Sequence, residues 1–153
     1  MTEIRIARAD DIDILMETRL EMLKIVNGLD EGYVFSEELK DESRRYFLEG
    51  DQTTVLAFVD GDLAGCASAS YIKIMPTVSH PTGKRAHVMN VYTRDRYRRQ
   101  GIAYKMRTML IEDAWAKGAT EISLDATSSG RPLYEKLGFT DSDECMVMVR
   151  KTV

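Results

Sequence analysis

The stretch VMNVYTRDRYRRQGIAYKMRTMLIEDAWAKG, residues 88–118, joins three different patterns in succession. Up to Thr93 it is rich in β-branched and aromatic residues without a helical period, which predicts a strand. From Gly101 the apolar residues recur at helical spacing, and Gly118 is suited to end that helix. A cation-rich loop lies between the two. Because a helix N-terminus offers unpaired backbone N–H groups, this order predicts a site for an anion.

The loop concentrates four arginines between residues 94 and 99 in a chain whose formal net charge is −4. A solvated basic loop with a glycine turn is the plain alternative to an anion site. Gly101 would let the backbone approach an anion, and Ala103 is also small. The spacing matches neither the three-glycine dinucleotide fingerprint nor the NTPase P-loop. The overall acidity argues against a broad face that neutralises nucleic-acid phosphates, so we expect no nucleic-acid partner.

The remaining patterns predict a single domain of mixed α/β type, since 153 residues suffice for one core. Before the central stretch we expect a strand near Ile4, helices opening at Asp10 and Ser36, strands over 53–59 and 63–74 joined at Asp60-Gly61, and a loop over 75–83. After it we expect a strand over 122–126, a short helix within SGRPLYEKLGF, and one or two strands over 139–150.

Composition bounds the class of protein. Hydrophobic residues make up 44% and charged residues 30% of the chain, as in ordinary globular domains. No apolar run is long enough for a bilayer, and the start MTEIRIARADDID lacks the apolar core of a signal peptide. We therefore expect a cytoplasmic protein without a membrane partner. Cys66 and Cys145 have no metal-ligand spacing, and we expect both to be buried or half-buried free thiols.

Residues 86–140 resemble the GNAT N-acetyltransferase superfamily. The acetyl-CoA motif of that family corresponds to about 86–118, and its downstream motif corresponds to about 120–140, which contains ISLDATSSGRPLYEKLGF. Over the first ninety residues only the order of elements matches. The resemblance implies one GNAT-like α/β (α+β) domain over 1–153. Its central mixed, mostly antiparallel sheet would be flanked by helices, and splayed strands would form an acetyl-CoA cleft.

The resemblance also implies the cofactor contacts, with acetyl-CoA as co-substrate and no metal. A bulged strand would pair with the pantetheine arm through its backbone, and its N–H groups could polarise the thioester carbonyl. In place of an asparagine common in the family, this chain has Thr127, Ser128 and Ser129, and Ser129 could either supply a hydroxyl or cap a helix. The residues implied in binding are Asn90, Val91 and Tyr92 on the strand, Arg98, Arg99, Gln100, Gly101, Ile102 and Ala103 in the loop, and Ser129.

For catalysis the resemblance places a general acid at Tyr134. A phenol with an ordinary pKa of about 10 carries its proton at neutral pH and can give it to a departing thiolate. The alternative is a core aromatic that packs beside its neighbouring leucines. His87 is a candidate base because its ordinary pKa suits that role, although a strand histidine is often structural. Glu17, Glu21 or a water chain are other routes, so the base stays open.

The acceptor side would involve the connection between the first two helices. Asp30, Glu31, Glu37 and Glu38 could attract a cationic amine, such as a polyamine, an aminoglycoside or a lysine side chain, or simply form a solvated face. Tyr33 and Phe35 could line an apolar pocket or anchor the loop. By resemblance we also expect a homodimer.

Two functions remain in competition after a third, nucleic-acid binding, is set aside. The first is an N-acetyltransferase that moves acetyl from acetyl-CoA to a primary amine of a small molecule or peptide by direct attack. The second is a non-catalytic module that binds or senses acyl-CoA. A third, nucleic-acid binding through the arginines, is disfavoured by the acidic balance.

Overall fold

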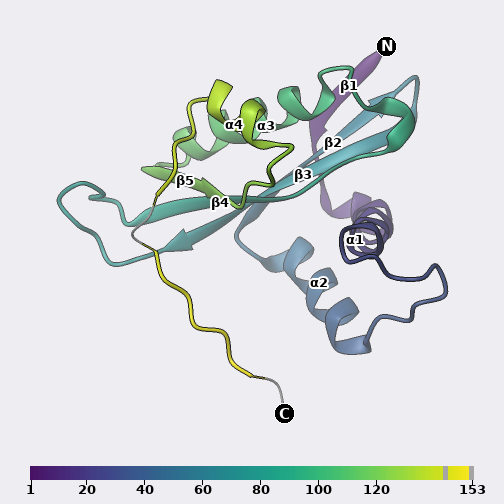
Figure 1. The fold of residues 1–153 in the computed structure, drawn as a ribbon, viewed down its shortest axis with the longest axis horizontal. Coiled ribbons are helices and arrows are strands. Elements are labelled where there is room, and N and C mark those ends of the chain that lie inside the picture. The colour runs from purple at the N-terminus through teal and green to yellow at the C-terminus, as the bar shows by residue number, and fades with distance from the viewer. Residues whose placement is uncertain (143–144, 152–153) are drawn as a thin grey trace.

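The computed structural model describes residues 1–142 and 145–151. Its centre is a five-stranded sheet whose order is β1-β2-β3-β4-β5, with one helix pair on each side (Figure 1). All neighbouring strands are antiparallel except β4 and β5, which run parallel. The strands are β1 (Thr2–Ile6), β2 (Gln52–Val59), β3 (Asp62–Lys73), β4 (Lys84–Thr93) and β5 (Glu121–Leu124). The helices are α1 (Ile12–Val26), α2 (Glu37–Glu49), α3 (Ile102–Ala116) and α4 (Arg131–Lys136), with short 3₁₀ turns η1 (Ala9–Asp11) and η2 (Asp95–Tyr97).

Local sequence signals account for several of these boundaries. Ser36 caps α2, because its hydroxyl accepts the Leu39 N–H at 3.1 Å. Asp60 and Gly61 both have positive φ, 49° and 87°, as the tight turn between β2 and β3 requires. The predicted mixed sheet, the helix from Ser36 and the hairpin at Asp60-Gly61 are confirmed.

Each face of the sheet has its own core. On one face, α3 packs Met106 and Leu110 against alanine-rich positions of β2, β3 and β4. On the other, Leu15 and Met22 of α1 contact Leu56 in the middle of β2. Small side chains on the sheet allow α3 to lie close to it, so the start of α3 is held beside the end of β4.

The C-terminal segment differs from its prediction. Strands were expected over 139–150, but the described residues of this range form none, and 143 and 144 lie outside the described residues. A run of β-branched and apolar residues forms a strand only when a neighbouring strand supplies hydrogen bonds. Here Met146 to Val149 are exposed and belong to no strand. The expectation of a shielded Cys145 is also wrong, since this thiol is exposed, whereas Cys66 is buried as predicted. Among the described residues, no helix combines the length and apolarity that crossing a membrane requires.

Candidate functional site

The centre of the site is a bulge in β4. Cys66 of β3 pairs with Tyr92, but two residues further along β3 the partner is Met89, so β4 carries one extra residue there. Asn90, inside this bulge, has a φ of 57°. Pairing between β4 and β5 is recorded only as far as Val88. The two strands therefore part at the bulge, as expected for residues 90–92, and leave β4 backbone available to a ligand.

Gly65 on β3 makes the bulge possible. A Cβ at this position would lie 2.4 Å from the Tyr92 carbonyl oxygen and 3.1 Å from the Thr93 Cα. Both are backbone atoms and cannot rotate away. Only glycine accommodates this approach of the two strands.

The loop after β4 forms an anion-binding shape. Arg99 and Gly101 both have left-handed conformations, with φ of 63° and 77°, around Gln100. Such alternation turns successive N–H groups toward one concave surface. In the described part of the chain these three N–H groups have no acceptor, and helical bonding of α3 begins only with Lys105 N–H to Gly101 at 3.1 Å. The geometry fits a diphosphate, and Gly101 is needed for its φ, since a Cβ there would contact nothing in the protein.

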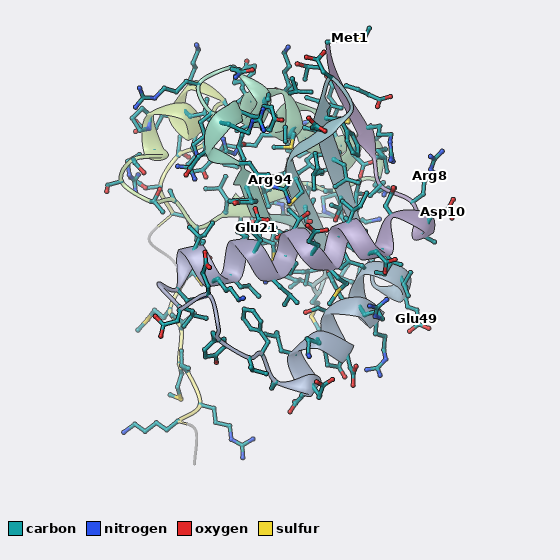
Figure 2. All side chains as sticks on the ribbon, turned by 90° about the vertical axis from the view of Figure 1, so that its right-hand side faces the viewer. Met1, Arg8, Asp10, Glu21, Glu49 and Arg94 are labelled. Atoms are coloured by element: carbon teal, nitrogen blue, oxygen red, sulfur yellow. The ribbon has the colours of Figure 1, made fainter. Side chains whose placement is uncertain are left out.

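The four arginine side chains of the loop have different partners. Arg94 binds Glu21 of α1, with Nη2 3.0 Å from Oε1, and Figure 2 shows the two side chains facing each other. Arg98 donates to the Thr93 carbonyl at 3.1 Å, and Arg96 stacks on Tyr97 with 5.0 Å to the ring centroid. Arg99 is exposed, and no hydrogen bond of its side chain is found among the described residues. Arg99, and Arg96 if it leaves Tyr97, are therefore available to an anion in the loop.

Glu21 is engaged in a hydrogen bond and an ion pair, which makes it a poor candidate for the general base. Tyr92 donates its hydroxyl to Glu21 Oε2 at 2.5 Å. Burial, followed by this bond to a carboxylate, raises the pKa of Tyr92 to about 12. Burial alone would raise the pKa of Glu21, but the hydrogen bonds from Tyr92 and Arg94 outweigh it and hold that pKa below its usual value. A carboxylate so stabilised is a weak proton acceptor.

Tyr134 lies on α4 and meets a buried arginine from α3. Arg107 Nη2 donates to Tyr134 Oη at 3.1 Å, and its guanidinium carbon is 4.7 Å from the ring centroid. Because a guanidinium can only donate, the tyrosine must direct its own O–H elsewhere. Gly130 leaves room for the ring, since a Cβ there would sit 3.0 Å from Tyr134 Cε2. The phenol is thus held by a cation that leaves its proton free.

Two other expected residues have local partners. His87 Nδ1 lies 2.7 Å from Ser123 Oγ, and Nε2 lies 3.7 Å from an Asp125 oxygen. The Ser129 hydroxyl lies 3.3 Å from the Thr127 hydroxyl. Thr127, not Ser129, accepts the Gly130 N–H at the start of α4, at 3.2 Å. Ser129 therefore does not cap the helix.

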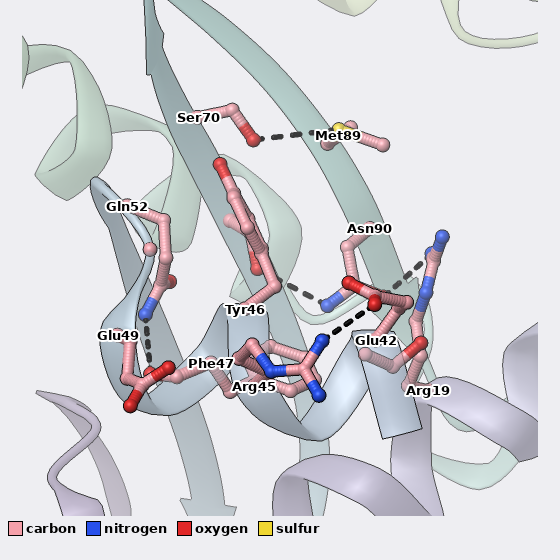
Figure 3. Close-up of a pocket in the computed structure, with 13 residues that line it drawn as sticks. Arg19, Glu42, Arg45, Tyr46, Phe47, Glu49, Gln52, Ser70, Met89 and Asn90 are labelled. Carbon is pink, nitrogen blue, oxygen red and sulfur yellow. Dashed lines mark hydrogen bonds and ion pairs between the residues drawn. The ribbon is translucent and has the colours of Figure 1, made fainter. Parts of the chain in front are cut away.

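A pocket of about 550 Å³ opens on the other side of the bulge (Figure 3). Its floor consists of side chains from β3 and β4, and its outer wall consists of α2. Arg19 of α1 reaches in and donates to Asn90 Oδ1 at 3.2 Å. The lining is Arg19, Glu42, Ser43, Arg45, Tyr46, Phe47, Glu49, Gly50, Gln52, Ser68, Ser70, Met89 and Asn90. We call this cavity the Arg19 pocket.

Comparison with known proteins decides the family. The sequence model of the acetyltransferase (GNAT) family matches residues 20–139. The chain belongs to this family. No curated protein sequence matches it. A predicted acetyltransferase from Clostridium acetobutylicum, solved with acetyl-CoA, is 29% identical over 97% of this chain and 96% of that one, with a TM-score of 0.83.

More distant GNAT structures share the fold. Glucosamine-6-phosphate N-acetyltransferase from Arabidopsis thaliana is 19% identical, with a TM-score of 0.71 and 99% of each chain covered. An aminoglycoside acetyltransferase from an uncultured soil metagenomic sample, in complex with trehalose, is 14% identical, with a TM-score of 0.75, over 99% of this chain and 96% of that one. The GNAT fold predicted from residues 86–140 is confirmed.

The acidic residues between α1 and α2 that could attract a cationic amine lie apart from the Arg19 pocket. Asp30, Glu31, Glu37 and Glu38 do not line the Arg19 pocket. Phe35 is buried and meets Tyr33 edge-on at 5.1 Å, so both anchor the connection between α1 and α2. Sequence reasoning did not single out Arg19 or Arg107, because an arginine on an amphipathic helix looks like a solvated one. Their partners, Asn90 and Tyr134, lie 71 and 27 residues away.

Proposed function

We propose that this GNAT transfers acetyl from acetyl-CoA to a primary amine, with Tyr134 as the general acid. Acetyl-CoA supplies the activated acetyl thioester. The N–H groups of the loop from Arg99 to Ala103 would bind its diphosphate, and the open backbone of β4 at Val91 and Tyr92 would orient its pantetheine arm. Both segments have the backbone geometry that these contacts need.

Tyr134 would give its proton to the leaving sulfur. The Arg107 guanidinium, 3.1 Å from the phenol oxygen, would balance the negative charge that remains. This contact is the observation that carries the proposal, because a tyrosine that served only as core packing would need no buried cation at its hydroxyl.

Proton removal from the amine needs no dedicated side chain in this scheme. Glu21 is engaged by Tyr92 and Arg94, and His87 by Ser123. Water in the open Arg19 pocket would carry the proton to solvent. His87 keeps a subordinate place as a base, through its nearby Asp125.

The acid role is tested by Tyr134→Phe in an assay of thiol release from acetyl-CoA across amines, amino acids, aminoglycosides and peptides. General acid catalysis typically contributes about 100-fold or more, so kcat should fall by at least that factor while the affinity for acetyl-CoA stays within about twofold. Undiminished turnover would remove Tyr134 from the mechanism.

Cofactor binding is tested by calorimetry with Gly101→Glu. The substitution forces a side chain into a left-handed conformation and places a carboxylate at the proposed diphosphate site, so acetyl-CoA binding should be lost. Gly28→Glu is the matched control, because Gly28 has a φ of 61° and no atom near its Cβ position but lies outside the loop. If the parent protein binds acetyl-CoA yet acetylates no amine, it is a sensing module instead.

A homodimer is also part of the proposal. Met146 to Val149 expose 83 to 98% of their surface, an apolar run that a second copy could cover. Sedimentation velocity over a range of concentrations tests it, and a monomer at every concentration would exclude the dimer.

A further inference from the structure

The Arg19 pocket contains a cation, Arg19, that has no carboxylate partner in the described part of the chain. Arg19 is half-buried, and among the described residues no carboxylate oxygen lies within 4.0 Å of its guanidinium. Its recorded hydrogen bond is to a neutral amide, Asn90 Oδ1, at 3.2 Å. Arg5 and Arg94, two other half-buried arginines, each bind a carboxylate, Asp11 and Glu21 respectively. Burial lowers the pKa of Arg19, which is the effect of withdrawing its charge from water without a counterion.

The other charges of the pocket do not compensate Arg19. Arg45 and Glu42 pair with each other at 2.5 Å on the exposed face of α2, at the rim. Glu49, near the end of α2, is exposed. Figure 3 shows Arg19 beside Asn90, which we call the inner end of the pocket, with Glu42 of α2 drawn near it but paired with Arg45. The inner end therefore favours an anionic ligand group, and a guanidinium suits a planar carboxylate, which it can bind with two parallel N–H donors.

The position of Arg19 restricts how far the anionic group of the acceptor substrate can lie from its reacting amine. Under the proposed function, the reacting amine must come to the bulge of β4, because that is where the thioester would lie. Arg19 is hydrogen-bonded to Asn90, a residue of the same bulge. The anchor for the anion and the place for the amine are thus immediate neighbours. An acceptor that uses both must carry its carboxylate within a few bonds of its amine.

The remaining walls of the pocket are partly apolar. Tyr46, Phe47 and Met89 contribute an aromatic and thioether surface, while Ser68 and Ser70 supply hydroxyls on the floor. A volume of about 550 Å³ is sufficient for a small molecule. A peptide N-terminus has its nearest free carboxylate elsewhere and would leave Arg19 without its partner.

We propose that the acceptor is a free α-amino acid with an apolar side chain, whose α-carboxylate binds Arg19 while its α-amine faces the bulge. This inference rests on the proposed function, since it assigns the substrate class of the same site. It also reverses the charge expected from the acidic connection between α1 and α2, because the inner pocket presents a cation.

The test compares L-leucine, L-leucinamide and isoamylamine, which share an apolar side chain and an amine but differ in the carboxylate. Hydrogen bonds to a charged group are worth roughly a 10- to 100-fold preference. We expect kcat/KM for leucine to exceed that for the other two by this factor. Arg19→Gln should abolish the preference for leucine. Arg19→Lys, which keeps the charge but cannot donate two parallel N–H bonds, should retain part of it. Arg44→Gln, exposed on α2 outside the pocket lining, is the matched control and should keep the full preference.

Calorimetry of leucine and isoamylamine with the parent and Arg19→Gln gives a readout independent of turnover. Leucine that binds more tightly than isoamylamine only when Arg19 is present supports the inference, even if no amine is acetylated and the proposed function fails. If isoamylamine or leucinamide is acetylated as well as leucine, the function stands and the inference is overturned. An equal loss of all three substrates in Arg19→Gln would likewise overturn it, because the arginine would then only support the fold of the bulge.

Discussion

Replacing Gly65 with alanine should disturb both the sheet and the proposed cofactor site. The new Cβ would lie 2.4 Å from the Tyr92 carbonyl oxygen, about 1 Å closer than ordinary contact allows. Because the opposing atoms are backbone, relief requires β3 and β4 to move apart at the bulge. Overpacking of this kind typically costs about 1–3 kcal/mol. At about 2–4 °C per kcal/mol for a domain of this size, the expected fall in Tm is about 2–12 °C.

Thermal and urea unfolding followed by circular dichroism measure this loss, and calorimetry measures acetyl-CoA affinity, which should weaken as the bulge widens. Gly32→Ala is the matched control, since its Cβ would have no atom within 4 Å and its φ is not left-handed. We expect that control to stay within about 0.5 kcal/mol of the parent. Gly65→Ala that melts with the parent and binds acetyl-CoA equally well would refute the role given to this close approach.

Three further predictions concern single groups. The Arg5 hydrogen bond lowers the pKa of Asp11 to about 2, so the Asp11 carboxylate stabilises the fold above about pH 4 and loses that contribution as the pH falls toward 2. In urea unfolding, Asp11→Asn should therefore lower the free energy of unfolding by about 2 kcal/mol at pH 7 and by nearly nothing at pH 2. Burial raises the pKa of the Cys66 thiol to about 12, so iodoacetamide should modify Cys145 in the native protein and Cys66 only in urea, as read by mass spectrometry. Ser36→Ala removes the cap of α2 and should lower the free energy of unfolding by about 1 kcal/mol.

Much of the fold could be predicted because its signals are local. Ser36 and Asp60-Gly61 act within three residues of themselves, and the helix from Ile102 shows its period directly. The apolar run Met146 to Val149 suggested a strand that did not form, because a local signal cannot show whether a partner strand is present. A strand needs a partner, and that information is not in the segment itself.

The site divides along the same line. The left-handed turn at Gly101 was predictable because it depends on backbone conformation, which glycine reveals. The pairing of Arg19 with Asn90 and the partnership of Arg107 with Tyr134 depend on how helices pack on the sheet. An isolated arginine in a helix pattern carries no mark of its distant partner, so these side chains could be assigned only from the three-dimensional arrangement.

The strand order of the sheet has a consequence for how the protein is made. Since β1 to β5 lie side by side in the order of the chain, each strand after β1 joins an edge formed by one that was synthesised earlier. A chain emerges from the ribosome N-terminus first, so β1 to β4 can begin to assemble before α3 has fully emerged. The bulged strand is then in place before the loop and helix that complete the anion site, and the site matures in the direction of translation.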